Sequence, residues 1–140
     1  MIKNAAALTE IRQQWGGVRM LRVRVQRLTV GSAVASLGSV LTLADIAHNL
    51  PFLHACAVLN EVLEQLRDEG AFHCKARTLG ALVKASAGSL EWVDLPGVEQ
   101  MVRDRNALAH GGTLLGRAQC WEYLDLVERQ FLAWGIMPRQ

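Results

Sequence analysis

Residues 53–70 read LHACAVLNEVLEQLRDEG, which makes them the most informative stretch of the chain for its architecture. The apolar residues recur every three or four positions and cover a broad face, as is typical of a helix at the centre of a bundle. Gly70 predicts the end of this helix, because glycine readily adopts the left-handed conformation found there. Asn60 and Glu61 interrupt the apolar run. Such polar residues usually face water, and a functional role for one of them is the alternative.

Upstream, this central helix is expected to extend back to near Thr42. Asn49 resembles an N-cap with Pro51 in the first turn, so we expect a kink or a restart there. Residues 29–39 are small and rich in Gly and Ser, which predicts a loop or hinge.

Downstream, three shorter helices are expected to complete the bundle. The first spans about residues 72–87. The second begins with Asp94 as its N-cap and stops at the glycine pair 111–112. The third spans about residues 117–134 and ends with Gly135, followed by an apolar residue and a nearby proline, which is a typical C-terminal stop.

The first thirty residues form a basic segment with a helical stripe of apolar side chains. They carry six basic residues and one acidic residue, a net charge of +5 in a chain whose formal net charge is +2. Residues 21–25 also alternate with the period of a strand, but the helical period holds over about twenty residues and favours a helix. Such a helix could grip phosphates or an acidic partner. The alternative is a solvated face whose arginines lie over apolar surface.

The overall composition fits one packed domain, because 51% of the 140 residues are hydrophobic and 20% are charged. We expect a single domain over residues 1–140, with the basic helix at 1–30 and the bundle at 42–134. Apart from the ambiguous segment 21–25, nothing in the sequence calls for a strand. The expected fold is therefore all-α, an up-and-down bundle of four to five helices.

Several classes of protein are disfavoured. No apolar run reaches the length of a membrane span and no signal peptide is evident, so we expect a soluble, cytoplasmic protein without membrane contact. The three cysteines form no CxxC pair and argue against a disulfide scaffold. His73 and Cys74 come nearest to a metal motif, but adjacent residues point in different directions on a helix. Neither a metal site nor a cofactor is expected.

The strongest candidates for catalytic residues lie at the end of the expected helix that begins after Asp94, where residues 103–112 read RDRNALAHGG. Asn106 and His110 are neighbours one turn apart, and Arg103 lies a further turn back on the same face. Arg105 is about 140° from His110 around an ideal helix. One copy therefore need not bring these two side chains together. Two copies meeting across a two-fold axis, or an unwound helix end, would do so more easily.

These groups suit the cleavage of an RNA phosphodiester. Histidine titrates near neutral pH, so the imidazole of His110 can take the 2′-hydroxyl proton or give a proton to the leaving 5′-oxygen. Arg105 can hold the non-bridging oxygens and stabilise the charge that develops on them. Asn106 can fix the imidazole tautomer or touch the sugar. The alternative is that these side chains only cap carbonyls at a helix end.

The segment RNALAH, from Arg105 to His110, resembles the R-x4-6-H signature of the HEPN family (higher eukaryotes and prokaryotes nucleotide-binding), which often has a polar residue after the arginine. The order of elements over about residues 42–134 is also similar. The resemblance implies a bundle that dimerises through the motif helix and a metal-independent endoribonuclease that leaves 2′,3′-cyclic phosphate and 5′-hydroxyl ends. It assigns phosphate binding to Arg105, acid/base chemistry to His110 and a supporting polar role to Asn106.

HEPN members include toxins of toxin–antitoxin pairs, antiviral effectors and RNA-processing enzymes, and some members are non-catalytic modules. Many toxin members read His-x-Tyr, whereas this chain has Gly112 at the last position, so nucleotidylation of that tyrosine does not carry over. The expected function is a homodimeric ribonuclease of toxin or defence type, with RNA contacts from Arg103, Arg22 and Arg24 and an antitoxin or regulatory protein as a further partner. The alternative is a non-catalytic interaction module that docks its partner through the N-terminal arginines.

Overall fold

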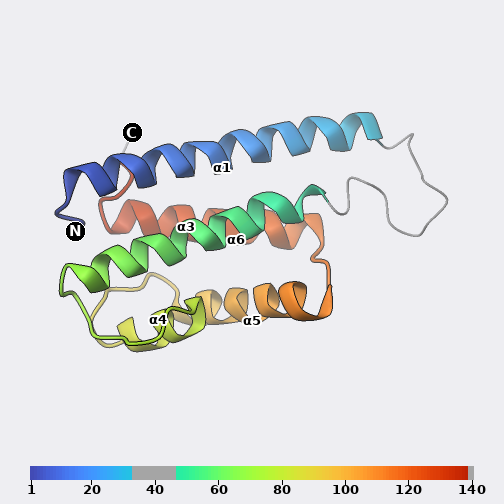
Figure 1. Ribbon diagram of the computed structural model, residues 1–140. Helices are drawn as coiled ribbons and strands as arrows, with labels where there is room; N and C mark the ends of the chain where they lie inside the picture. Colours follow the sequence, from blue (N-terminus) through green and yellow to red (C-terminus); the bar gives the residue numbers. More distant parts are fainter. Residues whose placement is uncertain (33–46, 139–140) are drawn as a thin grey trace.

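The computed structural model describes residues 1–32 and 47–138, and these residues form five helices and no strand. In chain order the helices are α1 (Ala5–Ser32), α3 (Asn49–Asp68), α4 (Leu79–Ser86), α5 (Leu95–Gly111) and α6 (Arg117–Ala133). The all-α prediction is confirmed. In Figure 1, α1 lies along one side of α3 and α6, and α4 and α5 lie along the other side.

Helix α3 is the centre of the bundle, because it packs against each of the other four helices. Ten of its twenty residues are buried, which agrees with the broad apolar face expected from the sequence. The helix ends as predicted at Gly70, whose φ is +87°. The N–H of Ala71 then donates to the carbonyl of Leu66 at 2.9 Å, which satisfies one of the last free carbonyls of the helix.

The start of α3 differs from the prediction. Asn49 is the first residue of the helix rather than its N-cap, a position that His48 occupies. The Asn49 amide is buried and bonds both main-chain groups of Leu115, accepting from its N–H at 3.0 Å and donating to its carbonyl at 3.2 Å. The N-cap prediction is wrong because the Asn49 side chain bonds Leu115, which is distant in the sequence. The expected helical residues 42–46 lie outside the described residues.

Helix α1 is longer than expected. It continues to Ser32, so the loop predicted for residues 29–39 is wrong over 29–32, and residues 33–39 lie outside the described residues. An established helix tolerates Gly and Ser, which cost about 1 kcal/mol or less each relative to Ala. Residues 21–25, which were ambiguous in the sequence, are helical. Ile11, Trp15 and Val18 are buried and hold α1 on the bundle.

Helix α4 is shorter than the segment 72–87 predicted for it, because it begins only at Leu79. Thr78 is the N-cap; it has an extended backbone, and its side chain accepts a hydrogen bond from the N–H of Ala81 at 3.4 Å. Phe72 is buried in the core, but it reaches the core from a non-helical segment. The sequence pattern placed Phe72 in a helix, whereas it anchors a loop in the core.

The ends of the last two helices are confirmed. The Asp94 carboxylate caps the first turn of α5 through a 3.0 Å bond from the N–H of Gly97, and α5 stops at Gly112 with a φ of +67°. Gly135 has a φ of +70° after α6, where the N–H of Ile136 donates back into the helix at 2.9 Å. Local capping signals were sufficient to place these ends.

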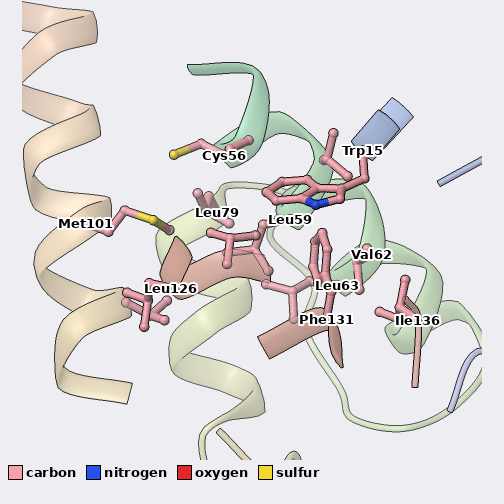
Figure 2. Packing of buried hydrophobic residues seen from close by; sticks show 14 of the residues in the cluster. Trp15, Cys56, Leu59, Val62, Leu63, Leu79, Met101, Leu126, Phe131 and Ile136 are labelled. Carbon is pink, nitrogen blue, oxygen red and sulfur yellow. The ribbon is translucent and has the colours of Figure 1, made fainter. Parts of the chain in front are cut away.

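The hydrophobic core joins α1, α3, α4, α5 and α6 into one cluster. At its centre Trp15 meets Phe131 edge to face, with ring centroids 5.0 Å apart, and Leu59 and Leu63 fill the space beside them (Figure 2). Such aromatic side chains contribute the largest buried areas to a core of this size. Among the described helices, none combines the length and the hydropathy that a bilayer crossing requires.

Candidate functional site

The fully buried residues of helix α5 all lie in its first half. Its buried residues are Val98, Met101 and Val102, and every later residue of the helix is half-buried or exposed. In the segment Arg103–Gly111, Leu108 still packs against the core, whereas the side chains of Arg103, Asn106 and His110 are exposed. Position along the helix, rather than a special local conformation, makes these side chains accessible.

Arg105 is half-buried and faces α3. Its guanidinium donates to the side-chain carbonyl of Asn106 at 3.2 Å, which links the two residues that the sequence analysis paired. Arg105 also borders a surface hollow of about 490 Å³, which we call the α3–α5 hollow. A volume of this size lies within the range of small-molecule sites.

The α3–α5 hollow is lined by polar side chains from three segments of the chain. They are Asn60, Glu61 and Glu64 of α3, Arg77 and Thr78 at the start of α4, and Arg105 of α5. Among the described residues, no hydrogen bond or ion pair involves the side chains of the first four, and Arg105 bonds only to its neighbour. Two arginines and two carboxylates therefore face one cavity without bonding to each other.

The floor of the hollow is apolar. Cys56 and Leu79 are buried there, and Ala57 completes the lining. Burial raises the pKa of the Cys56 thiol to about 12, although the positive charge of Arg105 acts in the opposite direction. The thiol is therefore neutral at physiological pH and is not a nucleophile. Figure 2 shows its sulfur pointing away from Trp15 at the edge of the packed cluster.

His110 lies near the C-terminal end of α5, is exposed, and is not among the residues that line the hollow. Because α5 is continuous from Arg105 to His110, the offset of about 140° expected for an ideal helix is retained. A single chain therefore does not bring these two side chains to one point. Unwinding of the helix end, which could have brought Arg105 and His110 together, does not occur before His110.

Arg103 is exposed, and its guanidinium donates to the side chain of Gln100 at 2.8 Å. Between the two motif arginines, Asp104 accepts hydrogen bonds from Gln100 and from the hydroxyl of Tyr123. Burial is the main reason that the pKa of Tyr123 is raised, and the bond to the Asp104 carboxylate raises it further. Asp104 thus fixes the second half of α5 to α6.

The arginines of α1 differ in the contacts that they make. Arg22 donates to Asp125 at 2.7 Å and lies over the ring of Trp121, with its guanidinium carbon 5.0 Å from the ring centroid. Arg19 bonds Glu128 at 2.5 Å, and the indole N–H of Trp15 donates to the same carboxylate at 3.0 Å. We call this set of contacts the α1–α6 seam.

Arg24, the third residue expected to bind RNA, is exposed and makes no hydrogen bond or ion pair with the described parts of the chain. Arg22 and Arg24 therefore have different surroundings, although both lie on α1. For Arg22, the arrangement over an aromatic ring matches the alternative in which arginines cover apolar surface.

The His73–Cys74 pair lies in the non-helical segment before α4, where the Cys74 thiol donates to the carbonyl of Ala76 at 3.3 Å. Within residues 1–32 and 47–138, no group of three or more His, Cys, Asp or Glu side chains is placed to hold a metal ion.

Sequence reasoning singled out Asn60, Glu61 and Arg105 but did not connect them, and it missed Glu64 and Arg77. Glu64 is one turn beyond Asn60 and Glu61 on the expected helix, so its position beside them was available from helical spacing. Arg77 had no comparable signal, because it lies in a segment that was expected to be helical and is not.

Neither family models, nor curated proteins, nor solved structures gave a match to this chain. The function is therefore inferred from the side chains of α3 and α5 and from the resemblance of the α5 motif.

Proposed function

We propose that the chain is a metal-independent endoribonuclease that acts as a homodimer. The observation that carries the proposal is Arg105, which borders a hollow and bonds the exposed Asn106, with an exposed His110 later on the same helix. The resemblance of the segment Arg105–His110 to the HEPN signature supports the same chemistry.

In the proposed reaction, the scissile phosphate lies against the guanidinium of Arg105. His110 removes the proton of the ribose 2′-hydroxyl, the 2′-oxygen attacks phosphorus, and the bond from phosphorus to the 5′-oxygen breaks. The protonated imidazole then gives its proton to the leaving 5′-oxygen, so the products are a 2′,3′-cyclic phosphate and a 5′-hydroxyl. Arg105 stabilises the additional negative charge on the non-bridging oxygens during this step.

The geometry of α5 supports the proposed dimer, as does the resemblance. Because Arg105 and His110 diverge around one continuous helix, a phosphate held by Arg105 needs a histidine from elsewhere. A second α5 related by a two-fold axis provides one, and it provides two such sites in one cleft. Sedimentation or light scattering should therefore give a dimer in solution, and a monomer at all accessible concentrations would contradict this arrangement.

The decisive assay is cleavage of a mixed RNA pool in EDTA by wild type, Arg105→Ala and His110→Ala, all at equal purity. We expect cyclic-phosphate ends from wild type and a loss of at least about 100-fold in each variant, which is typical for removing an acid/base group or a charge-stabilising donor. Arg129→Ala is the matched control, because Arg129 is exposed on α6, outside the site. Equal cleavage by wild type and His110→Ala would refute the proposed site.

The biological role that fits such an enzyme is a toxin or an antiviral defence effector, with an antitoxin or regulatory protein as its partner. Expression of wild type should then arrest growth, and His110→Ala should not. Arrest by both proteins would argue against RNA cleavage as the cause.

A non-catalytic interaction module is the second candidate, and the divergence of Arg105 and His110 within one chain favours it. The N-terminal arginines then provide the docking surface. In this case Arg22→Glu combined with Arg24→Glu should impair function more than Arg105→Ala or His110→Ala. Arg24→Glu alone separates docking from folding, because Arg22 is already bonded within the α1–α6 seam and Arg24 is not.

A further inference from the structure

The α3–α5 hollow contains more chemistry than the proposed cleavage step uses. That step needs Arg105 for the phosphate, but the same cavity presents Asn60, Glu61, Glu64 and Arg77. None of these four side chains has a hydrogen bond or ion pair within the described residues. Uncommitted polar groups that converge from α3 and from the start of α4 are the usual arrangement of a ligand site.

The charges in the hollow restrict the kind of ligand. Arg77 and Arg105 balance Glu61 and Glu64, so the cavity does not favour a simple polyanion. Among the described residues, Glu61 and Glu64 do not belong to any group of three or more His, Cys, Asp or Glu side chains that could hold a metal ion. The balance fits a ligand that combines a phosphate with hydrogen-bond donors.

The floor of the hollow restricts the ligand further. Cys56 and Leu79 are only 2% and 4% exposed, so the apolar side chain of the lining that a ligand can reach is the exposed Ala57. A flat aromatic ring can cover this side chain while its edge reaches the carboxylates of α3. Together with the arginines, this describes a site for one nucleotide, and a volume of about 490 Å³ is of a suitable size.

The carboxylates select among the bases. An ionised carboxylate only accepts hydrogen bonds. Guanine presents two adjacent donors on its Watson–Crick edge, the ring N1–H and the exocyclic amino group, which match the two oxygens of one carboxylate. Adenine and cytosine each place an unprotonated ring nitrogen beside their amino group, and uracil places its single ring N–H between two carbonyls. Each of these three bases therefore places an acceptor opposite the carboxylate, where no hydrogen bond can form.

We propose that the α3–α5 hollow binds the guanosine that lies immediately 5′ of the cleaved bond. Glu61 and Glu64 bond the base edge, the ring lies over Ala57, and Arg105 and Arg77 hold the 3′-phosphate. The inference rests on the proposed ribonuclease function, and it specifies that function as cleavage after guanosine.

Binding is tested separately from cleavage by titrating the full chain with guanosine 3′-monophosphate and with adenosine 3′-monophosphate in a calorimeter. Wild type should bind the guanosine compound at least about tenfold more tightly, which is the discrimination expected from one two-point hydrogen-bonding contact. The double variant Glu61→Gln with Glu64→Gln should lose this preference, because each amide replaces an acceptor with a donor. Arg77→Ala should weaken the binding of both nucleotides by a similar factor and leave the ratio of their affinities unchanged.

Glu10→Gln is the matched control. Glu10 borders a neighbouring acidic groove together with Glu61 and Glu64, but it does not line the hollow. It should keep the preference of wild type. If the double variant does not fold, the single variant Glu61→Gln changes only an exposed side chain and should reduce the preference on its own.

The inference is overturned if wild type binds both nucleotides equally, or if the preference survives in a folded double variant. RNA cleavage distinguishes its failure from that of the enzyme proposal. Cleavage without a bias for guanosine would leave a ribonuclease and remove the base-reading role of the hollow. A guanosine preference in binding, without cleavage of any RNA, would leave the nucleotide site and remove the ribonuclease.

Discussion

In the α1–α6 seam, Arg19 and Arg22 each bond a carboxylate of α6, whereas in the α3–α5 hollow Arg77 and Arg105 face two carboxylates without bonding to either. The residue types are the same in the two regions. The difference is that the seam closes two helices onto each other, while the hollow leaves a volume of about 490 Å³ between its groups. Paired charges of the first kind hold elements together, and unpaired charges of the second kind are available for a ligand.

The comparison also separates the arginines that sequence analysis had grouped by charge. Arg22 takes part in the seam, but Arg24 has no partner among the described residues. A basic helix is therefore not one functional surface. Its arginines divide into those that attach α1 to the bundle and those that remain accessible.

The largest expected effect is on the apolar centre of the seam. Trp15→Ala should lower the free energy of unfolding by about 3–5 kcal/mol, because Trp15 is 1% exposed and its removal leaves a cavity beside Phe131. Urea denaturation followed by circular dichroism measures this loss. Met20→Ala is the control on the same helix; Met20 is 58% exposed, so the change should stay within about 0.5 kcal/mol. Similar losses in both variants would contradict the packing of α1.

The next effect concerns pH and two buried thiols, those of Cys56 and Cys120. Burial raises the pKa of Cys56 and of Cys120 from the ordinary value of 9.0 to about 12. Between these values the unfolded chain releases thiol protons that the folded chain keeps. The stability that the two protonated thiols contribute is therefore fully present below about pH 9, and it is lost as the pH rises toward 12. Urea denaturation across this interval should show the fall, and a variant with both Cys56→Ala and Cys120→Ala should show a smaller one. An equal fall in that variant would mean that water reaches these thiols.

A smaller effect is expected from the charged part of the seam. Arg22→Ala should cost about 0–1 kcal/mol, as is usual for partly exposed ion pairs, and added salt should reduce the difference from wild type. Arg24→Ala, two residues further along α1, should leave stability unchanged. If Arg24→Ala costs as much as Arg22→Ala, the distinction between attached and accessible arginines fails.

The smallest effect on stability is expected in the hollow. Arg77→Ala should change the free energy of unfolding by less than about 0.5 kcal/mol, because Arg77 is exposed and has no partner in the described chain. Thermal unfolding of wild type and variant measures it. A loss above about 1 kcal/mol would show that Arg77 supports the fold, which would remove the contrast between the two regions.

For the described residues, the order of the helices and four of their ends could be predicted from the sequence. Gly70, Gly112 and Gly135 ended helices as expected, and the Asp94 cap was correct, because each of these signals acts over a few residues. The same local reasoning failed at Asn49. Its side chain was read as a cap for its own helix, but it bonds Leu115, a residue 66 positions away. A pattern within one segment contains no information about such a partner.

The candidate site was predicted in part for the same reason. Helical spacing placed Arg105, Asn106 and His110 on one helix and gave the angle between them, and the structure retains that geometry. Spacing did not reveal that Arg105 meets Glu61 and Arg77 at a hollow, since these residues come from three segments. The chain by itself determined the helices and the residue types that they present. Only the packing of α4 and α5 against α3 decided which of those residues face one cavity, because the sequence specifies local hydrogen bonds and apolar faces, whereas proximity between distant residues arises when those faces are buried together.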